Sequence, residues 1–273
     1  MYSKKINIGI IQGRLTKTRR NILQKFPKNW EREFQEASSL GYNYIEFFSE
    51  RKINLKNPIW SKNSILLYKA LARKYNLKTY SFVDDFIINH NFCNLKTIKY
   101  LKNLVRKVSF LKIKYLILPF YEKSKINENN YKIYLPFLKK ICEFSISCKV
   151  KILIESNLSP DLYFKIKKEG ELKNFNLVID TGNRINLKRN FYDDVLTLKK
   201  EIKHIHIKDK NDKLENVILG KGNVNFYKFF NILKKIKYTG RFTVESTRGN
   251  NPIKTAKKNI LYIYNCLKKT NFI

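Results

Sequence analysis

The most regular feature of the chain is an alternation of short apolar runs with longer amphipathic stretches. The apolar runs are rich in β-branched and aromatic residues, which is typical of strands that are buried on both faces. They occupy residues 6–11, 44–48, 77–83, 115–119, 150–155, 177–180, 202–207 and 242–245. The pattern therefore predicts eight strands.

The stretches between these runs have the length and apolar spacing of helices. They cover residues 30–40, 61–75, 95–111, 131–148, 159–168, 192–200, 226–236 and 252–267. Gly41 follows the first stretch as a helix-stop signal, and Ser159-Pro160 is a typical helix start. Strands that alternate with helices favour parallel pairing.

Eight strand–helix units in 273 residues predict an α/β protein, a (β/α)8 TIM barrel with a single domain over residues 1–273. An open doubly wound sheet is the alternative. However, the segment after the first strand reads Gly9-Ile10-Ile11-Gln12-Gly13 and contains no GxGxxG phosphate loop. No linker or low-complexity tract divides the chain, which favours the barrel.

Four successive predicted strands end in a side chain that can bind a metal ion. These are Glu155, Asp180, His206 and Glu245. Active sites of such barrels form at the carboxyl ends of the strands, and a carboxylate there is costly to bury without a partner. Three carboxylates with one imidazole suit Mn²⁺, Mg²⁺ or Co²⁺, with Zn²⁺ also acceptable and a thiolate zinc site excluded. A structural network without metal is the alternative.

Other polar residues near the predicted strand ends are candidates for contact with a substrate. Gln12 and Arg14 follow the first strand, Glu46 ends the second, and Lys208 follows the seventh. Arginine can bind a carboxylate or phosphate in a bidentate fashion, and Arg248 has the same weaker claim. For both arginines a solvated surface position is the preferred interpretation, and for Glu46 a structural hydrogen bond is an equal alternative to a role in the pocket.

Two further histidines have simpler interpretations. His204 lies two residues before His206, so both point to the same face of the strand. We expect His204 to be a hydrogen-bonded core residue or to orient a ligand rather than to bind metal itself. His90 lies in a polar stretch after the third strand and is expected to be a loop residue.

The composition is strongly basic, with 56 Lys and Arg against 22 Asp and Glu and a formal net charge of +34. Such a charge attracts nucleic acid and anionic substrates. Lysine is nevertheless spread along the whole chain and is accompanied by abundant asparagine and isoleucine, so a general compositional bias is the preferred interpretation. A nucleic-acid partner is therefore disfavoured, and association into a homo-oligomer is left open.

The remaining composition favours a cytoplasmic location. No apolar run is long enough to cross a bilayer, so no membrane partner is expected. The start of the chain carries Lys4 and Lys5 and leads directly into the first predicted strand, which makes it a poor signal peptide. The four cysteines fit no CxxC pairing and are expected to be buried, reduced thiols. They are Cys93, Cys142, Cys148 and Cys266.

The chain resembles the xylose isomerase-like superfamily of TIM barrels, which holds sugar and sugar-phosphate isomerases and epimerases, inosose-processing enzymes and the endonuclease IV type of DNA-repair enzyme. Motifs spread over nearly the whole chain carry the resemblance. They lie at residues 8–14, 41–46, 154–155, 180–183, 204–209, 219–224, 238–240 and 244–245. The resemblance implies that Glu155, Asp180, His206 and Glu245 are metal ligands, and that Glu155 and Glu245 are also an acid/base pair.

This sequence departs from the family pattern at two positions. Asn183 stands where the family commonly has a histidine, and it can hydrogen-bond a substrate hydroxyl but cannot act as a base. Lys221 stands where the glycine-rich loop usually carries an acid; a solvated lysine is the preferred interpretation, and contact with a substrate anion is the alternative.

Together these features predict a metal-dependent isomerase or epimerase of a sugar, a sugar phosphate or a related keto-polyol. A metal-bound carbonyl oxygen would stabilise the enediolate that forms when the neighbouring carbon loses a proton. The alternatives are a barrel that binds a sugar without converting it, and a lyase or dehydratase. A DNA-repair endonuclease is disfavoured because its three-zinc cluster needs several histidines, and this chain has only three.

Overall fold

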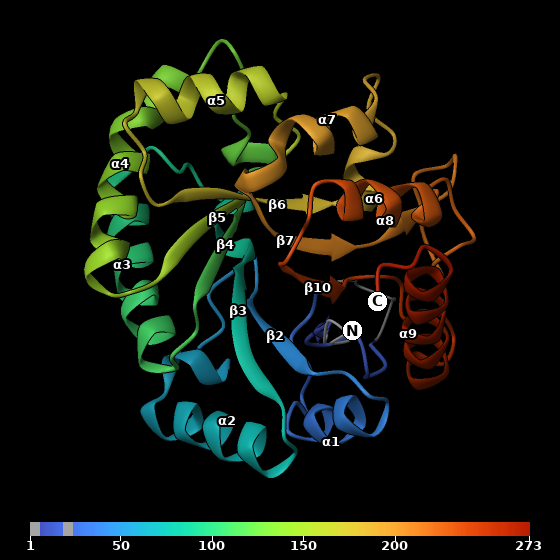
Figure 1. Cartoon of the computed structure of the whole chain (residues 1–273). Helices are drawn as coiled ribbons and strands as arrows, with labels where there is room; N and C mark the ends of the chain where they lie inside the picture. The colour runs from blue at the N-terminus through green and yellow to red at the C-terminus, as the bar shows by residue number, and fades with distance from the viewer. Residues whose placement is uncertain (1–5, 19–23) are drawn as a thin grey trace. The chain divides into compact units, whose positions relative to one another are not determined.

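The computed structural model describes residues 6–18 and 24–273 (Figure 1). All eight predicted strands are present. They are β1 (Ile8–Ile11), β2 (Tyr44–Ser49), β3 (Lys78–Asp84), β4 (Tyr115–Pro119), β5 (Lys151–Glu155), β6 (Phe175–Asp180), β7 (Ile202–Ile207) and β10 (Arg241–Val244). Their hydrogen-bonded order is β1-β10-β7-β6-β5-β4-β3-β2, which closes a barrel. The predicted (β/α)8 fold is confirmed.

The predicted helices follow the strands with shifts of only a few residues at their ends. They are α1 (Arg32–Ser39), α2 (Lys62–Lys74), α3 (Leu95–Phe110), α4 (Tyr131–Ser147), α5 (Pro160–Glu169), α7 (Phe191–Leu198), α8 (Phe226–Lys235) and α9 (Pro252–Lys269). The predicted helix start at Ser159 is confirmed, because its hydroxyl accepts a hydrogen bond from the Leu162 amide.

Short elements were not predicted. A single-turn helix α6 (Thr181–Arg184) follows β6 directly, and an antiparallel pair, β8 (Asp209–Lys210) with β9 (Asn216–Val217), follows β7. Within residues 6–18 and 24–273 there are also four 3-10 segments: η2 (Pro58–Trp60), η3 (Asp85–Asn89), η4 (Glu122–Ser124) and η5 (Lys199–Glu201). Elements of two to five residues are too short to leave a hydrophobic period in the sequence.

The chain divides into two compact units, which we describe separately. The first unit comprises residues 1–45, 72–78 and 179–273. In it β10 pairs in parallel with both β1 and β7, with Ile8 opposite Phe242 and Arg241 opposite His204. The Tyr44 hydroxyl donates to the carbonyl oxygen of Phe242, and α8 packs against α9 (Figure 1). This unit carries the ends of β6, β7 and β10.

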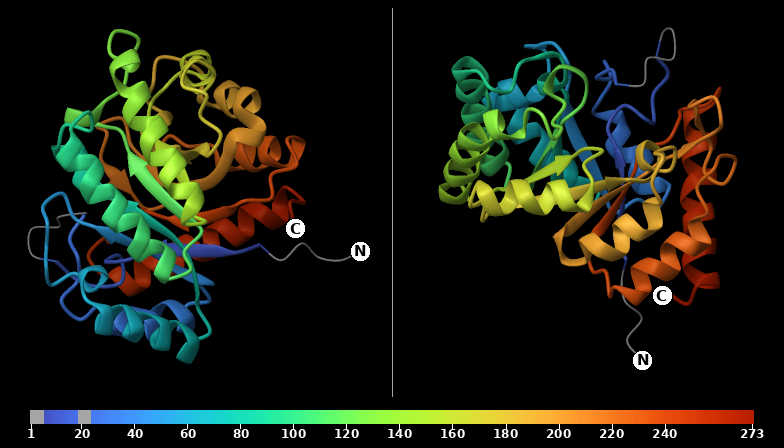
Figure 2. Two further views of the ribbon diagram at one scale, coloured as in Figure 1. Left: turned by 90° about the vertical axis from the view of Figure 1, so that its left-hand side faces the viewer. Right: turned by 90° about the horizontal axis from the view of Figure 1, so that it is seen from above.

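The second unit comprises residues 46–71 and 79–178. Strands β3, β4, β5 and β6 pair in parallel there, and Glu155 at the end of β5 lies opposite Val178 of β6. Helices α3 and α4 pack against each other (Figure 2). The strand residues from Leu116 to Leu118 and from Ile152 to Ile154 are fully buried, as expected of strands covered on both faces.

Most of the other sequence predictions can be placed in this structure. Lys4 and Lys5 lie outside the described residues, and the single-domain assignment over residues 1–273 stays a prediction. All four cysteines are free thiols, but Cys93 and Cys148 are half-buried rather than buried. Within the described part of the chain, no helix combines the length and the apolar character that a bilayer crossing requires.

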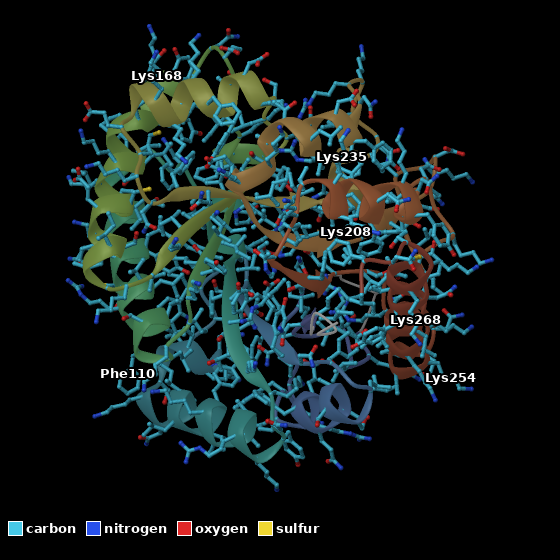
Figure 3. The ribbon with its side chains drawn as sticks, viewed as in Figure 1. Phe110, Lys168, Lys208, Lys235, Lys254 and Lys268 are labelled. Carbon is cyan, nitrogen blue, oxygen red and sulfur yellow. The ribbon has the colours of Figure 1, made fainter. Side chains whose placement is uncertain are left out.

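Lysines on the helices account for much of the visible basic character. Figure 3 labels Lys168 on α5, Lys235 on α8, and Lys254 and Lys268 on α9, all on helices outside the strands. Lys208, by contrast, follows β7 and is only 5% exposed. This one lysine therefore needs a different explanation from the others.

Candidate metal centre

Three of the four predicted ligands lie together at the ends of neighbouring strands of the first unit. Asp180 ends β6, His206 lies near the end of β7, and Glu245 directly follows β10. Each offers one ligand atom, and these atoms lie within 4.8 Å of one another. The His206 Nδ1 atom is 2.9 Å from Glu245 Oε2. All three side chains are buried, at 1%, 0% and 3% exposure respectively.

Cationic and polar groups surround the carboxylate of Glu245. The Lys208 ammonium lies 3.0 Å from Glu245 Oε1 and 2.8 Å from Asp180 Oδ2. Gln24 Nε2 donates to Glu245 Oε1 at 2.9 Å, and Arg14 Nη2 lies 3.7 Å from the same oxygen. Burial by itself would raise the pKa of Glu245, but Lys208, His206 and Arg14 hold that pKa well below its ordinary value. Glu245 is therefore an anion at neutral pH.

Two buried arginines connect the loop after β1 to the segment after β10. Arg14 Nε donates to the carbonyl oxygen of Ser246, and its Nη2 donates to Gln24 Oε1. Arg248 Nε donates to the carbonyl oxygen of Gly13 at 2.5 Å. The two arginines are 2% and 4% exposed, so their interpretation as solvated surface residues is wrong. Arg14 fixes Gln24, which in turn holds Glu245.

A buried glutamate of α1 holds the same loop from the other side. Glu33 accepts hydrogen bonds from the amides of Gly13 and Leu15 and from the Thr16 hydroxyl. Burial raises the pKa of Glu33 to about 7, although these hydrogen bonds and the charge of Arg248 act in the opposite direction. The sequence does not indicate this role, because a glutamate in the first turn of a helix is usually solvated and stabilises the helix through its interaction with the helix dipole.

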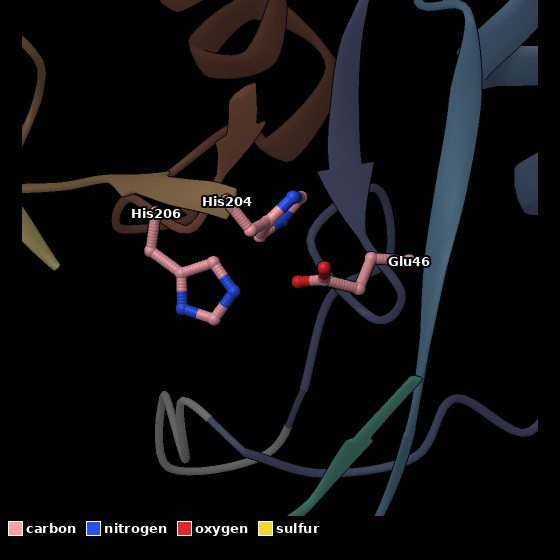
Figure 4. A group of neighbouring side chains, drawn as sticks. All are labelled: Glu46, His204 and His206. Atoms are coloured by element: carbon pink, nitrogen blue, oxygen red, sulfur yellow. The ribbon is translucent and has the colours of Figure 1, made fainter. Parts of the chain in front are cut away.

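The two histidines of β7 have different surroundings. Both leave the strand on the same face (Figure 4), as the alternation predicts. His204 is fully buried, and its Nε2 lies 2.9 Å from the Thr243 hydroxyl. The expectation that His204 is a hydrogen-bonded core residue is confirmed, while His206 faces Glu245.

The remaining candidates of the first unit do not form one group. Gln12 is buried at 1% exposure just after β1. The backbone amide of Asn183 donates to Asp180 Oδ1 at 2.8 Å and so orients this carboxylate, while the Asn183 side chain is half-buried. Lys221 is exposed, in agreement with its interpretation as a solvated loop lysine.

In the second unit, Glu155 ends β5, whereas Glu46 lies within β2 because that strand continues to Ser49, so the prediction that Glu46 ends its strand is wrong. Both carboxylates accept hydrogen bonds from hydroxyl groups. Tyr121 Oη donates to Glu155 Oε1 at 3.2 Å, and Ser81 donates to Glu46. Glu155 is 5% exposed and Glu46 is fully buried. His90 is a half-buried residue whose Nδ1 lies 2.7 Å from the carbonyl oxygen of Phe86, as expected of a loop residue.

The cluster of the first unit fits a divalent cation. Two carboxylates and one imidazole are the donors that Mn²⁺, Mg²⁺, Co²⁺ and Zn²⁺ accept, and their ligand atoms are close enough to share one ion. A divalent ion would also compensate the negative charge of these two buried carboxylates. No cysteine belongs to this cluster.

A comparison with protein-family models assigns this architecture to a family. The model described as "Xylose isomerase-like TIM barrel" matches residues 34–266, which is most of the chain. The chain belongs to this family. A curated relative, an uncharacterized protein of Methanocaldococcus jannaschii, is 27% identical over 152 residues; the match covers 52% of this chain and only half of that relative's length.

Solved structures of similar fold cover nearly the whole xylose isomerase-like barrel. D-psicose 3-epimerase from Clostridium cellulolyticum H10, solved with D-tagatose, has 13% sequence identity and a TM-score of 0.75, over 98% of this chain and 99% of that one. L-ribulose 3-epimerase has 15% identity and a TM-score of 0.78 over 98% and 96%. The IOLI protein with a bound zinc atom has 18% identity and a TM-score of 0.74 over 97% and 99%. At these identities the likeness shows the fold alone.

The glycine-rich loop of this xylose isomerase-like barrel is organised by an aspartate whose role was missed from the sequence. Asp209 accepts hydrogen bonds from the amides of Gly220, Gly222 and Val224. Burial raises the pKa of Asp209, whereas these amides act in the opposite direction. A side chain at Gly222 would overlap the Asp209 carboxylate. An acid just after a strand, followed by two glycines spaced by one residue, is the signal that could have revealed it.

Proposed function

We propose that this protein is a metal-dependent isomerase or epimerase of a sugar, a sugar phosphate or a related keto-polyol. The observation that carries the proposal is the buried group of Asp180, His206 and Glu245 at adjoining strand ends. The similar structures include D-psicose 3-epimerase and L-ribulose 3-epimerase, which supports a sugar-like substrate class. A divalent cation held here would polarise a substrate carbonyl and stabilise the negative charge that develops beside it.

Glu155 is proposed as the fourth ligand. It ends β5 opposite Val178, and β6 continues from Val178 for two more residues to Asp180. The hydroxyl of Tyr121, which donates to Glu155 Oε1, would fix the rotamer of the carboxylate. The continuity of β6 from the partner of Glu155 to a ligand of the cluster supports this assignment.

Proton transfer is assigned to Glu155 and Glu245. One carboxylate removes the proton from the carbon beside the substrate carbonyl, and the other returns a proton to that carbon or its neighbour. Glu245 is suited to accept a proton because it is ionised, and Gln24 and Arg14 keep its carboxylate in place. Its low pKa makes it a weak base in the resting protein, so the proposal requires the reacting proton to be acidified by the polarised carbonyl.

The proposed substrate contacts come from groups around the same strand ends. Asn183 offers an amide side chain that is half-buried next to Asp180. Lys208 is within hydrogen-bond distance of Glu245, and Gln12 and Arg14 follow β1. Glu46 is included as a fully buried carboxylate of β2. The hydroxyl groups of a polyol could form hydrogen bonds with these amide and charged side chains, which include both donors and acceptors.

The metal requirement is tested by adding Mn²⁺, Co²⁺ or Mg²⁺ to chelator-treated protein and following thermal unfolding. Binding to the folded state alone should raise the unfolding temperature with metal concentration. Glu155→Gln should reduce this shift, because it removes one charged donor. If none of the three ions stabilises the protein, and Glu155→Gln behaves identically, the proposal is wrong.

The chemistry is tested by incubating the metal-loaded protein with a panel of ketoses in heavy water. A working base exchanges the hydrogen on the carbon beside the carbonyl for deuterium, which mass spectrometry or NMR detects. Metal binding without exchange on any ketose or ketose phosphate would instead favour a barrel that binds a sugar without converting it.

A further inference from the structure

Two consecutive residues after β6, Thr181 and Gly182, fix the position of Lys208. The Lys208 amide donates to the Thr181 hydroxyl oxygen at 2.9 Å, and the Thr181 hydroxyl donates to the Lys208 carbonyl oxygen at 2.6 Å. At Gly182, an added Cβ would lie 2.8 Å from Cγ of the Lys208 side chain. Any residue larger than glycine would therefore push the lysine stem away from its place.

This position directs the ammonium group to the two carboxylates of the candidate metal centre. Lys208 Nζ lies 2.8 Å from Asp180 Oδ2 and 3.0 Å from Glu245 Oε1. The other carboxylate oxygen of Asp180 already accepts the Asn183 amide. A lysine at 5% exposure loses most of its hydration, and only good ionic partners compensate for that loss.

We propose that Lys208 is a built-in counter-cation that competes with the divalent metal for Asp180 and Glu245. This inference rests on the proposed metal centre, and it names Lys208 as a residue that lowers the affinity of that centre for the metal ion. A metal ion takes carboxylate oxygens at about 2.1 Å. It cannot use Asp180 Oδ2 while the ammonium remains 2.8 Å away without strong repulsion between two poorly screened cations. Metal binding therefore requires Lys208 to withdraw from at least one carboxylate.

The direct test is calorimetric titration of chelator-treated protein with Mn²⁺, comparing wild type with Lys208→Met. Methionine keeps an unbranched stem and removes the charge. The dissociation constant for Mn²⁺ should fall by about tenfold, which corresponds to ~1.4 kcal/mol, because no ion pair must be broken. The metal-free variant should also unfold at a lower temperature than the metal-free wild type, since two buried carboxylates lose a cation.

Lys210→Met is the matched control, because it removes the same charge two residues further on, where the side chain is half-buried in β8. Its Mn²⁺ affinity should equal that of wild type. Gly182→Ala is a second variant that keeps the charge and displaces only the lysine stem. It should tighten Mn²⁺ binding by a smaller factor, and it decides the question if Lys208→Met does not fold.

The possible results separate this inference from the proposed function. Tighter Mn²⁺ binding by Lys208→Met or Gly182→Ala supports the competition, and so does binding by a variant when wild type binds none. Equal or weaker binding by both variants, with a wild type that binds Mn²⁺, overturns the competition and leaves the proposed function intact. Absence of Mn²⁺ binding in all proteins overturns both.

Discussion

Asp84 at the end of β3 and Glu245 directly after β10 are buried carboxylates of different units, and their partners differ in charge. In the second unit, Asp84 accepts hydrogen bonds from the hydroxyls of Ser49 and Tyr100, and burial raises its pKa to about 6. In the first unit, Glu245 faces Lys208, His206 and Arg14, and its pKa is held well below the ordinary value. Neutral donors can fix the position of a carboxylate, whereas cations also keep it ionised.

This difference teaches how to separate a structural carboxylate from a reactive or metal-binding one. Asp84 and Glu245 are 0% and 3% exposed, so burial does not distinguish them. The charge of the neighbouring groups distinguishes them. Glu245 is an anion stabilised by cations, and a divalent metal ion could stabilise the same anion. The comparison yields four expectations, from the largest effect to the smallest.

Glu245→Gln should have the largest effect. In the deuterium-exchange assay its rate should fall by about 10²- to 10⁴-fold, because the amide can neither accept the proton nor bind metal as an anion. Asp84→Asn should retain exchange within a small factor of wild type. If both variants lose the same fraction of the exchange rate at the same metal saturation, the charge around a buried carboxylate does not indicate whether it takes part in the reaction.

Glu33→Gln should change the pH dependence of stability. The folded-state pKa of about 7 exceeds the ordinary 4.5, so the protonated form is favoured by folding. That contribution is fully present below pH 4.5 and is lost as the pH rises through 7, by about 3 kcal/mol in total. Glutamine cannot ionise and should flatten this decline. Urea unfolding at pH 4.5, 6 and 7.5 measures it, and parallel curves for the two proteins would contradict the expectation.

Asp84→Asn should produce a similar but slightly smaller change in a lower pH window. The pKa rises from 3.8 to about 6, so wild-type stability should fall between these values by about 3 kcal/mol. Asparagine keeps an oxygen that can accept from Ser49 and Tyr100. The decisive interval is pH 7 to 7.5, where Glu33→Gln should still differ clearly in slope from wild type and Asp84→Asn should differ little.

The sequence predicted the fold well because the fold depends on repeated signals. Each strand and each long helix has its own hydrophobic period, and eight repetitions leave little choice of architecture. The grouping of Asp180, His206 and Glu245 could be predicted because each one is a polar residue at or near the end of an apolar strand. Their grouping then followed from the rule that carboxyl ends of parallel strands meet at one edge.

The residues that tune the site could not be predicted in the same way. Gln24 lies in a loop without periodicity, and its bond to Glu245 joins positions 221 residues apart. Arg14 and Arg248 appeared solvated because arginine usually is, and burial of a charge depends on partners that only the folded chain brings together. Thr181 and Gly182 were visible as part of a motif, but their contacts with Lys208 require the register of α6 against the end of β7.

The smallest effect is expected at Lys221. This lysine is exposed in the loop that Asp209 organises, so Lys221→Ala should change the free energy of unfolding by less than about 0.5 kcal/mol and leave Mn²⁺ affinity unchanged. Its neighbour Gly222 provides the contrast, because a methyl group there would overlap the Asp209 carboxylate and should cost more than about 1 kcal/mol. Calorimetric unfolding of both variants, with a Mn²⁺ titration, separates the two positions. A clear loss of Mn²⁺ affinity in Lys221→Ala would mean that this exposed lysine influences the metal centre. Exposed charges near the site would then affect metal binding as well as buried ones.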